Sequence, residues 1–451
     1  MQRRMALRLL GGGVAALAAR RPLWAAAAAA TGPAAEHDYF VFIHAAGGWD
    51  VTLWADPRNE RKGLVEPAST DNTDVAGLAR WKGVALDGDT DTFAPLAASD
   101  SKLVLGPGIG ALYDLRDRLT VINGLAMNTV SHPDGTMFSA TGRHLAGGRA
   151  PASSIDVAIA NELGADQLLP AVAIQFPSAF VGEHLDRRVI PLRVSSAATV
   201  AKSLSRSTAY LDTADRAAIT AVLTDEASAL AGRSVFPETY ERIASQQRAQ
   251  PRLIGGELEK AFTQKALQDA YPSFDYKSRS QSAGALSAAF ALEAIRRNVV
   301  RSVGFALGGL DTHNQNYKQH ARTLQELFGV IANLIAVLDA TPHPTRTGRK
   351  LADHTHILVF SEFCRTPQIN LSGGRDHYPN NSALVISPRF RGGLAFGKTD
   401  PEQLLPADAK TFADGPRPIA PPDLLATFLS AFGVPPAPYL RDGEVVPELL
   451  R

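Results

Sequence analysis

Short apolar runs, each ending in glycine or polar residues, alternate with longer segments of helical spacing. The strongest runs are residues 38–44 (DYFVFIH), 118–123 (RLTVIN), 299–308 (VVRSVGFALG) and 356–360 (HILVF). Runs of this length, rich in valine, isoleucine and phenylalanine, are typical of buried strands. Weaker runs of the same kind occupy residues 171–176, 189–194 and 382–386.

Residues 196–300 are instead rich in alanine, glutamine, arginine and glutamate with helical spacing, and an amphipathic helix is predicted from His313 to Asp339. Strands that alternate with helices predict an α/β fold with a mostly parallel central sheet and helices on both faces. We expect a single domain over residues 36–451, with 196–300 as a mainly helical insertion or flank. The proline-rich tail from Asp400 is predicted to wrap the surface.

The first thirty residues have the composition of an export signal. Arg3 and Arg4 precede an apolar stretch, and small residues follow up to Ala30. The paired arginines favour the twin-arginine export machinery, which predicts a periplasmic or secreted bacterial protein. Arg20 and Arg21 interrupt the apolar stretch before it reaches the length of a stable membrane span.

The charge and the cysteine count of the chain exclude several classes of partner and cofactor. Residues 1–30 hold five arginines and no acid, so removing them from the 46 bases leaves 41 bases against 45 acids. A slightly acidic chain does not indicate a nucleic-acid partner. Cys364 is the one cysteine, which excludes an intrachain disulfide, an iron–sulfur cluster and a CxxCH haem site. The sequence also lacks a GxGxxG dinucleotide motif.

Acids and histidines follow the predicted strands. They are Asp50, the stretch Met127–His144, Asp311 with His313, and Glu362; Asp376 and His377 directly precede the run at 382–386. Because ligands of such sheets bind beyond the carboxyl ends of the strands, we expect these side chains to meet at one edge. Carboxylates and imidazoles are ligands of divalent metals, so the sequence predicts a metal site there.

Each residue also has a structural interpretation. Asp50 and Asp311 would be helix N-caps, with His313 an ordinary first-turn residue. Glu362 would pair with Arg365, and His377 would be a hydrogen-bonded loop histidine. His354 and His356 precede their strand and so lie at its opposite end; we leave them out of the site.

The same segments resemble a known family. The leader, GGWD at 47–50, GGLDTHNQNYKQH at 308–320, SEFCRTPQIN at 361–370 and GGRDHYPNNS at 373–382 look like domain-of-unknown-function family 1501. These exported bacterial proteins resemble the alkaline phosphatase/sulfatase superfamily. The resemblance implies an alkaline-phosphatase-like fold over nearly the whole mature chain.

The superfamily pattern implies metal-binding roles. Asp50 resembles the first-strand ligand of one metal, and Asp311 with His313 resembles the motif for the other. Glu362 takes the place of an aspartate, and His377, next to Asp376, resembles a late histidine ligand. Two positions depart from the pattern: one residue separates Asp311 from His313 where phosphatases usually have three, and Phe363 stands where a histidine is usual.

The nucleophile of the superfamily lies at a helix start after the second strand, where Ser131-His132-Pro133-Asp134-Gly135 resembles the sulfatase segment. Ser131 is our first choice as nucleophile; Thr129, Thr136 or no protein nucleophile are the alternatives. His132 would be a general acid or a metal ligand. Arg143 and His144 would contact an oxyanion or end a solvent-facing helix.

Two functions fit these residues. The first is an exported, metal-dependent hydrolase of small-molecule phosphate or sulfate esters, holding zinc, manganese or calcium. The second is a catalytically degenerate secreted protein that keeps the fold for binding or assembly. Phe363 and the altered Ser131 segment favour the second function.

Overall fold

A computed structural model describes residues 38–58, 61–66, 95–97, 102–204, 257–314 and 316–451, with a few isolated positions between 214 and 229. The predicted export signal at 1–30 lies outside these residues.

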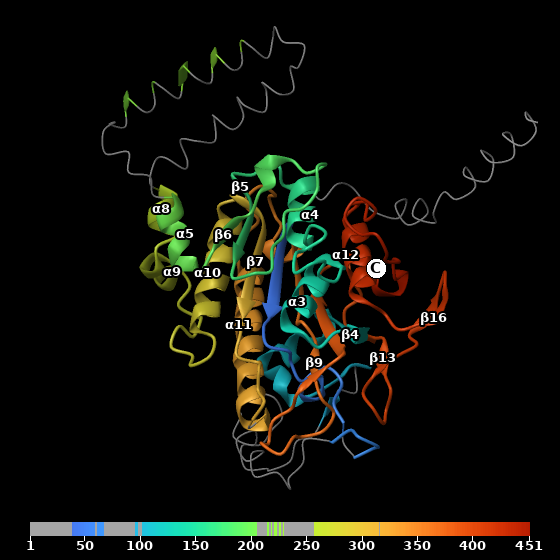
Figure 1. The fold of residues 1–451 in the computed structure, drawn as a ribbon. Coiled ribbons are helices and arrows are strands. Elements are labelled where there is room, and N and C mark those ends of the chain that lie inside the picture. The colour runs from blue at the N-terminus through green and yellow to red at the C-terminus, as the bar shows by residue number, and fades with distance from the viewer. Residues whose placement is uncertain are drawn as a thin grey trace, which may run out of the picture.

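An eight-stranded sheet forms the centre of the protein (Figure 1). In spatial order its strands are β12 (Leu394–Phe396), β4 (Leu119–Ala126), β11 (Asn380–Ile386), β8 (Thr355–Phe360), β1 (Tyr39–Ala45), β7 (Val300–Leu307), β5 (Leu169–Ile174) and β6 (Leu192–Val194). Within this sheet only β11 runs against its neighbours, β4 and β8. The predicted α/β class with a mostly parallel sheet is confirmed.

Both faces of the sheet are buried, as the nearly continuous apolar strands require. On β1, Val41 and Ile43 belong to the apolar core on one face, whereas Phe40 and Phe42 belong to the core on the other. This alternation follows from the two-residue period of a strand. β1 therefore lies in the middle of the molecule, and its carboxyl end is fixed by β7 on one side and β8 on the other.

Helices cover each face. The first core contains α10 (Ser282–Arg296), α11 (Ala321–Ala340) and η3 (Pro107–Arg118), and the second contains α4 (Ile155–Leu163) and α12 (Pro421–Ala431). α3 (His132–Thr141) packs beside α12. Among the described helices, Gln319–Ala340 is long and apolar enough to cross a membrane, but half of it is buried in the protein.

Smaller elements complete the chain. The described helices of 196–300 before β7 are α5 (Ala197–Leu204), α8 (Glu257–Ala261), α9 (Gln264–Ala270) and α10, with turns between α9 and α10. The short strand pairs are β2 (Leu96–Ala97) with β3 (Val104–Leu105), β9 (Cys364–Arg365) with β10 (His377–Tyr378), β13 (Lys398–Thr399) with β14 (Pro406–Ala407), and β15 (Lys410–Phe412) with β16 (Gly415–Arg417). The single-turn helices are η1 (Val51–Leu53), η4 (Arg187–Val189), η5 (Asn316–His320), η6 (Leu351–His354) and η7 (Pro447–Leu449).

The prediction that the tail from Asp400 wraps the surface is wrong for α12. Leu424 and Phe428 are buried in the second core, so this helix is a structural layer of the fold. Pro421 and Pro422 occupy its first turn, where proline's missing N–H has no helical partner to lose.

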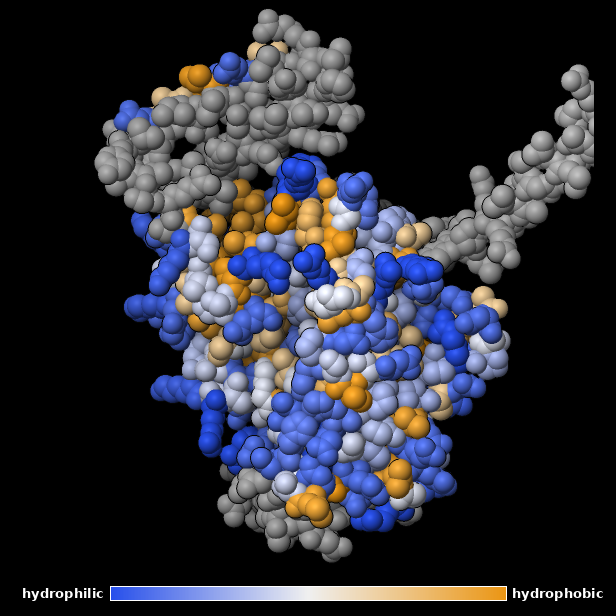
Figure 2. Space-filling view, in the orientation of Figure 1, coloured by the Kyte–Doolittle hydropathy of each residue, from blue (hydrophilic) through white to orange (hydrophobic). Residues whose placement is uncertain are grey.

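The carboxyl edge of the sheet lies at the bottom of Figure 1, toward which β1 points. Figure 2 shows the same face as a surface: its lower part is mainly hydrophilic, whereas apolar side chains gather toward the top. The loops that carry the candidate chemistry are therefore in a polar part of the molecule.

Candidate metal centre

The loops after β1, β7 and β8 meet at the carboxyl edge, as the parallel topology requires. Ala46 N–H donates to the Leu307 carbonyl (2.8 Å), and Leu310 N–H donates back to the Ala46 carbonyl (3.3 Å). The β9–β10 pair sets His377 opposite Arg365, which follows β8. The segments that hold Asp311, Glu362 and His377 are therefore joined to one another through backbone contacts.

Three histidines face one aspartate oxygen at this edge. The Nε2 atoms of His313, His132 and His377 lie 3.1, 3.4 and 3.5 Å from Asp311 Oδ1. The Nε2 atoms of His313 and His377 are themselves 3.1 Å apart. His132, Asp311 and His377 each offer a ligand atom within 4.8 Å of the others, which makes them a candidate metal-binding cluster.

These separations have the size expected around a single ion. Zinc–nitrogen bonds of about 2.0–2.1 Å place neighbouring atoms of a tetrahedral ligand set about 3.3 Å apart. Three imidazoles with one carboxylate are also a donor set that zinc prefers. Asp311 is half exposed, so the cluster is open to solvent.

The outer nitrogen of each histidine has an acceptor. His132 Nδ1 lies 2.8 Å from Glu362 Oε1, His313 Nδ1 lies 2.7 Å from Asp376 Oδ1, and His377 Nδ1 lies 2.9 Å from the Val130 carbonyl oxygen. A carboxylate or carbonyl accepts, so each Nδ1 carries the proton in this arrangement. With Nδ1 bound to these acceptors, the Nε2 atoms are turned toward Asp311, an arrangement typical of metal-bound histidine.

His132 gives the clearest sign of a missing partner. Its Nε2 is buried and makes no hydrogen bond within the described part of the chain. The hydrogen bond with Glu362 raises the pKa of His132 against the effect of burial. A buried lone pair without a donor is costly unless some group occupies the space in front of it.

Glu362 stands behind His132. Its carboxylate also lies 3.1 Å from His44 Nε2 and accepts from Gly47 N–H at 2.8 Å. Burial alone would raise the pKa of Glu362, but the His44 charge and the hydrogen bonds from His132 and His44 lower it. The Glu362 carboxylate therefore stays ionised and orients His132. The structural alternative for Glu362, a pair with Arg365, does not describe these contacts, since Arg365 pairs with Asp311.

Arg365 supplies a fixed positive charge beside the cluster. Its guanidinium is fully buried, donates to the carbonyls of Gly47 and Gly48, and donates to Asp311 Oδ1 at 2.6 Å. Burial would raise the pKa of Asp311, but the Arg365 hydrogen bond and charge lower it. Asp311 is therefore an anion at neutral pH and has a second lone pair for a cation.

Comparison with known proteins assigns the chain to a family. Residues 40–442 match the family model described as "Protein of unknown function (DUF1501)". The chain belongs to this family. No curated protein is significantly similar to this DUF1501 chain. The expected membership is thus confirmed, and the alkaline-phosphatase-like part of the resemblance stays a hypothesis.

Several solved chains are similar to this DUF1501 protein, and one of them has low sequence identity to it. It is described as "Crystal structure of Ps i-CgsB in complex with k-i-k-neocarrahexaose". The identity is 12% and the TM-score 0.36, over 90% of this chain and 75% of that chain.

Asp50 lies outside the histidine cluster in this DUF1501 chain. Its fully buried carboxylate caps η1, accepting from Thr52 N–H (3.0 Å) and from Thr52 Oγ1. Asn316 donates to the other oxygen at 2.7 Å, and Arg375 lies 3.5 Å from it. The structure thus gives Asp50 the contacts of the N-cap interpretation.

The predicted catalytic residues of the DUF1501 chain are spread along α3. Ser131 is the exposed N-cap residue and is directly followed by His132, which belongs to the cluster. Arg143 follows the other end of the helix and lines a separate cavity. His144 bonds to Asp134 (2.9 Å) and so fixes the turn after α3.

The structure also brings in residues that sequence reasoning did not select. His44, the histidine that ends the DYFVFIH run, contacts Glu362, and the Val130 carbonyl oxygen accepts from His377. Phe363 packs its ring against His132 and His377, with centroids 4.8 and 4.5 Å apart, and forms one wall of the cluster. The sequence signal that could have identified His44 is its position near the carboxyl end of the strand β1.

Proposed function

We propose that this DUF1501 protein is an exported, metal-dependent hydrolase of phosphate or sulfate esters. The observation that supports this most is that three Nε2 atoms and Asp311 Oδ1 converge while every outer nitrogen is already bound. Such preorganisation is costly to build without a ligand to hold, and it matches what a hydrolytic metal site needs.

His132, His313, His377 and Asp311 would hold the ion. A bound divalent metal supplies Lewis-acid chemistry and lowers the pKa of a hydroxyl or water. The three-nitrogen, one-oxygen donor set favours zinc over calcium, which prefers oxygen ligands. Glu362 and Asp376 keep two of the histidines oriented, and Arg365 offsets negative charge at Asp311.

Ser131 is the hydroxyl we propose as nucleophile, because it is exposed and directly precedes His132. Its place at the start of α3 would favour an alkoxide through the helix dipole. An attacking water is the alternative. Arg143 has no place in this step, since α3 separates it from His132.

The second candidate is a degenerate binding or assembly protein. Two observations favour it: Asp50 is fully occupied by structural contacts, and Phe363 stands where the superfamily has a histidine. A second metal ion near the first would have neither the Asp50 carboxylate nor a histidine at position 363 as a ligand. Turnover is therefore the property that separates the two candidates.

Metal content tests the cluster first. We expect the purified full-length chain to hold about one divalent ion, measured by mass spectrometry of the metals, and Asp311→Asn and His313→Ala to lose it. His184→Ala is the matched control, because this exposed histidine lies outside the cluster. A wild-type chain that holds no zinc, manganese or calcium after incubation with each would contradict the proposal.

Turnover is tested on aryl phosphates and aryl sulfates. We expect activity in the metal-loaded wild type that falls by at least about 10²-fold in Asp311→Asn. Loss in Ser131→Ala with metal retained would identify Ser131 as nucleophile, whereas full activity would assign the attack to water. A metal-loaded protein without turnover on either ester class would favour the binding protein.

Export by the twin-arginine route is part of the proposal and rests on residues 1–30. Changing Arg3 and Arg4 together to lysine should retain the full-length precursor in the cytoplasm, measured by fractionation. Lysine at Arg20 and Arg21 is the matched control. Equal export of both variants would contradict this route.

A further inference from the structure

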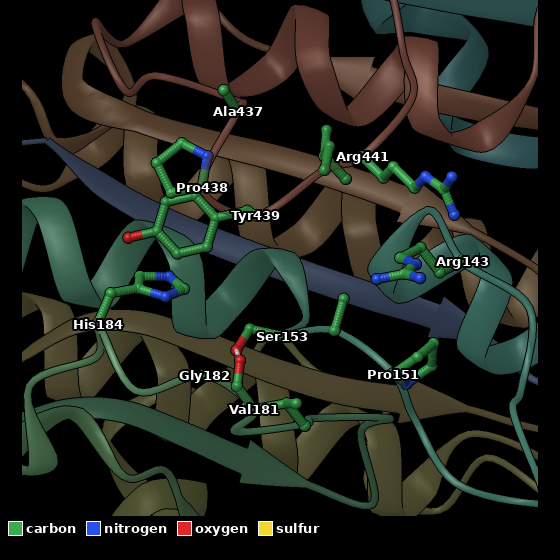
Figure 3. Close-up of a pocket in the computed structure, with 12 residues that line it drawn as sticks. Arg143, Pro151, Ser153, Val181, Gly182, His184, Ala437, Pro438, Tyr439 and Arg441 are labelled. Carbon is green, nitrogen blue, oxygen red and sulfur yellow. Dashed lines mark hydrogen bonds between the residues drawn. The ribbon is translucent and has the colours of Figure 1, made fainter.

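A second site candidate lies away from the metal cluster, in a cavity of about 280 Å³. Four segments of the chain form it: the turn after α3, the entry to α4, the loop after β5 and the segment following α12 (Figure 3). Its polar lining includes Arg143, Arg441 and His184, and no aspartate or glutamate is among its lining residues. The cavity is therefore a concave surface of positive character.

Neither arginine has an ion pair or side-chain hydrogen bond within the described part of the chain. Arg143 is half-buried and Arg441 exposed, and Figure 3 shows both guanidinium groups on the same side of the pocket, away from His184. Other arginines in the described part of the chain pair with carboxylates, as Arg365, Arg188 and Arg417 do. Two free guanidinium groups at one cavity leave a place for an external anion.

The two arginines are held as neighbours by the residues before them. Gly142 ends α3 with φ +69°, and a Cβ there would lie 2.8 Å from Leu440 Cδ2. The Leu440 side chain thus packs directly on the glycine that precedes Arg143, and Arg441 follows Leu440. This packing brings the backbones of Arg143 and Arg441 close together at one side of the cavity.

The remaining walls are also fixed before any ligand arrives. Ser153 Oγ donates to the Val181 carbonyl (2.7 Å) and accepts from Val181 N–H (2.9 Å). The Tyr439 hydroxyl donates to Glu162 and accepts from Asn161 at 2.8 Å. Bonds of this kind make a preformed pocket, which loses little entropy when it binds.

We propose that this cavity binds a small molecule through one oxyanion group, a sulfate, phosphate or carboxylate. Guanidinium groups bind such anions with paired, charge-assisted hydrogen bonds. Pro151, Pro438 and the Tyr439 ring provide apolar walls for a body of about one sugar ring, which the volume admits. Catalysis at the metal cluster is not required for this binding.

The test is calorimetric titration of the full-length, chelator-treated protein with sodium sulfate, sodium phosphate and sodium glucuronate, at ionic strength held constant with chloride. We expect saturable binding of at least one probe, and the strongest probe identifies the oxyanion. Arg143→Gln and Arg441→Gln should each weaken it about tenfold, and the double variant should abolish it.

Two controls make the result specific. Arg349→Gln removes an exposed arginine outside the cavity and should leave the affinity unchanged, and Asp311→Asn should also leave it unchanged because the metal cluster is a different site. Equal binding by wild type and the double variant would overturn the proposal, as would the absence of saturable binding to all three probes. An equal loss in Arg349→Gln would also overturn it, because binding would then follow net charge alone.

Discussion

At the scale of single residues, the cluster depends on acceptors behind the histidines as much as on the ligand atoms. Glu362 is 3% exposed and joins His132, His44 and the Gly47 amide through one carboxylate. Asp376 holds His313 from a more exposed position. The two carboxylates fix which nitrogen carries the proton, so they decide which nitrogen is free for a metal.

Glu362→Gln should weaken zinc binding about 10- to 100-fold, because an amide presents a donor as well as an acceptor and no longer enforces the His132 tautomer. Competition with a chromophoric chelator measures the affinity. Urea unfolding of the metal-free variant separates this effect from a loss of fold.

Glu448→Gln is the matched control for that substitution. Glu448 is exposed and pairs with Lys410 at 3.1 Å, outside the cluster, so its substitution should leave the zinc affinity unchanged. A zinc affinity of wild-type strength in Glu362→Gln would show that Glu362 has no positioning role.

At the scale of elements, α3 is positioned by a glycine in its first turn. A Cβ at Gly135 would lie 2.3 Å from the carbonyl oxygen of Glu362. The helix therefore rests directly on the backbone of the strand-end loop, three residues after His132. This close approach explains why a poor helix former occupies an interior helix position.

Gly135→Ala should destabilise the protein by about 1–3 kcal/mol and weaken zinc binding, because α3 must move away from Glu362 and carry His132 with it. The gain in helix propensity, about 1 kcal/mol, is smaller than the cost of the clash. Urea unfolding and the zinc titration measure the two effects.

Gly329→Ala in α11 is the contrasting change. No atom lies within 4 Å of a Cβ built there, so the substitution should stabilise the protein by up to about 1 kcal/mol. If both alanine variants shifted stability in the same direction, local packing would not be the deciding factor.

Most strands were predictable because their apolar runs end in glycine or polar residues, as DYFVFIH does before Gly47. The start of α11 was predicted too early. Residues Asn316–His320 form a π-helical turn in which Asn316 bonds to Asp50, a contact between residues 266 positions apart. α12 was missed because its two initial prolines resemble a loop in sequence.

Part of the cluster was also within reach of the sequence. The positions of Asp311, His313 and His377 beside strand ends predict that they approach one another, and their role as ligands stays a prediction. The contacts of Asp50 were not predictable, because a buried N-cap and a ligand have the same local sequence. The Val130 carbonyl is a backbone group and leaves no sequence signal at all.

At the scale of the whole molecule, the amino edge of the sheet carries a second cluster of polar side chains, centred on the buried Asp38 and His356. Asp38 lies 2.7 Å from His354 Nδ1, 3.3 Å from His356 Nε2 and 3.5 Å from Arg389. His356 also bonds to Ser387 (2.8 Å), and the rings of Phe40 and Phe432 pack on it. Burial lowers the pKa of His356 against the attraction of Asp38.

This group predicts a loss of stability in mild acid. Between its lowered pKa and the unfolded value of about 6.5, His356 binds fewer protons in the folded state, so the free energy of unfolding falls as pH drops below about 6.5. Burial would raise the pKa of Asp38, but hydrogen bonds and charge from His356, His354 and Arg389 lower it. Asp38 therefore extends the loss of folding stability below about pH 4.

Urea unfolding of His356→Gln between pH 7.5 and 5 measures this contribution. The variant should lose about 1–3 kcal/mol at neutral pH and show a flatter pH dependence than the wild type. His184→Gln is the control, because His184 is exposed and should leave the profile unchanged. An identical slope in His356→Gln and wild type would assign the pH dependence to other groups.

Removal of metal should lower the melting temperature without unfolding the protein. The cluster side chains keep their hydrogen bonds to Glu362, Asp376 and Val130, and the sheet is buried independently of them. Calorimetry of zinc-loaded and chelated protein should show a higher transition temperature with zinc, rising with its concentration. A chelated chain lacking a cooperative transition would mean that the metal is needed for folding.

Gly374 has a consequence for comparing chains of this family. A Cβ there would lie 1.9 Å from the carbonyl carbon of His313, so the loop with Asp376 and His377 nests against the loop with Asp311 and His313. Any larger residue would clash with His313 and separate the two loops, even if every histidine were retained. The amino acid aligned with Gly374 therefore distinguishes homologous sequences that can assemble this cluster from those that cannot.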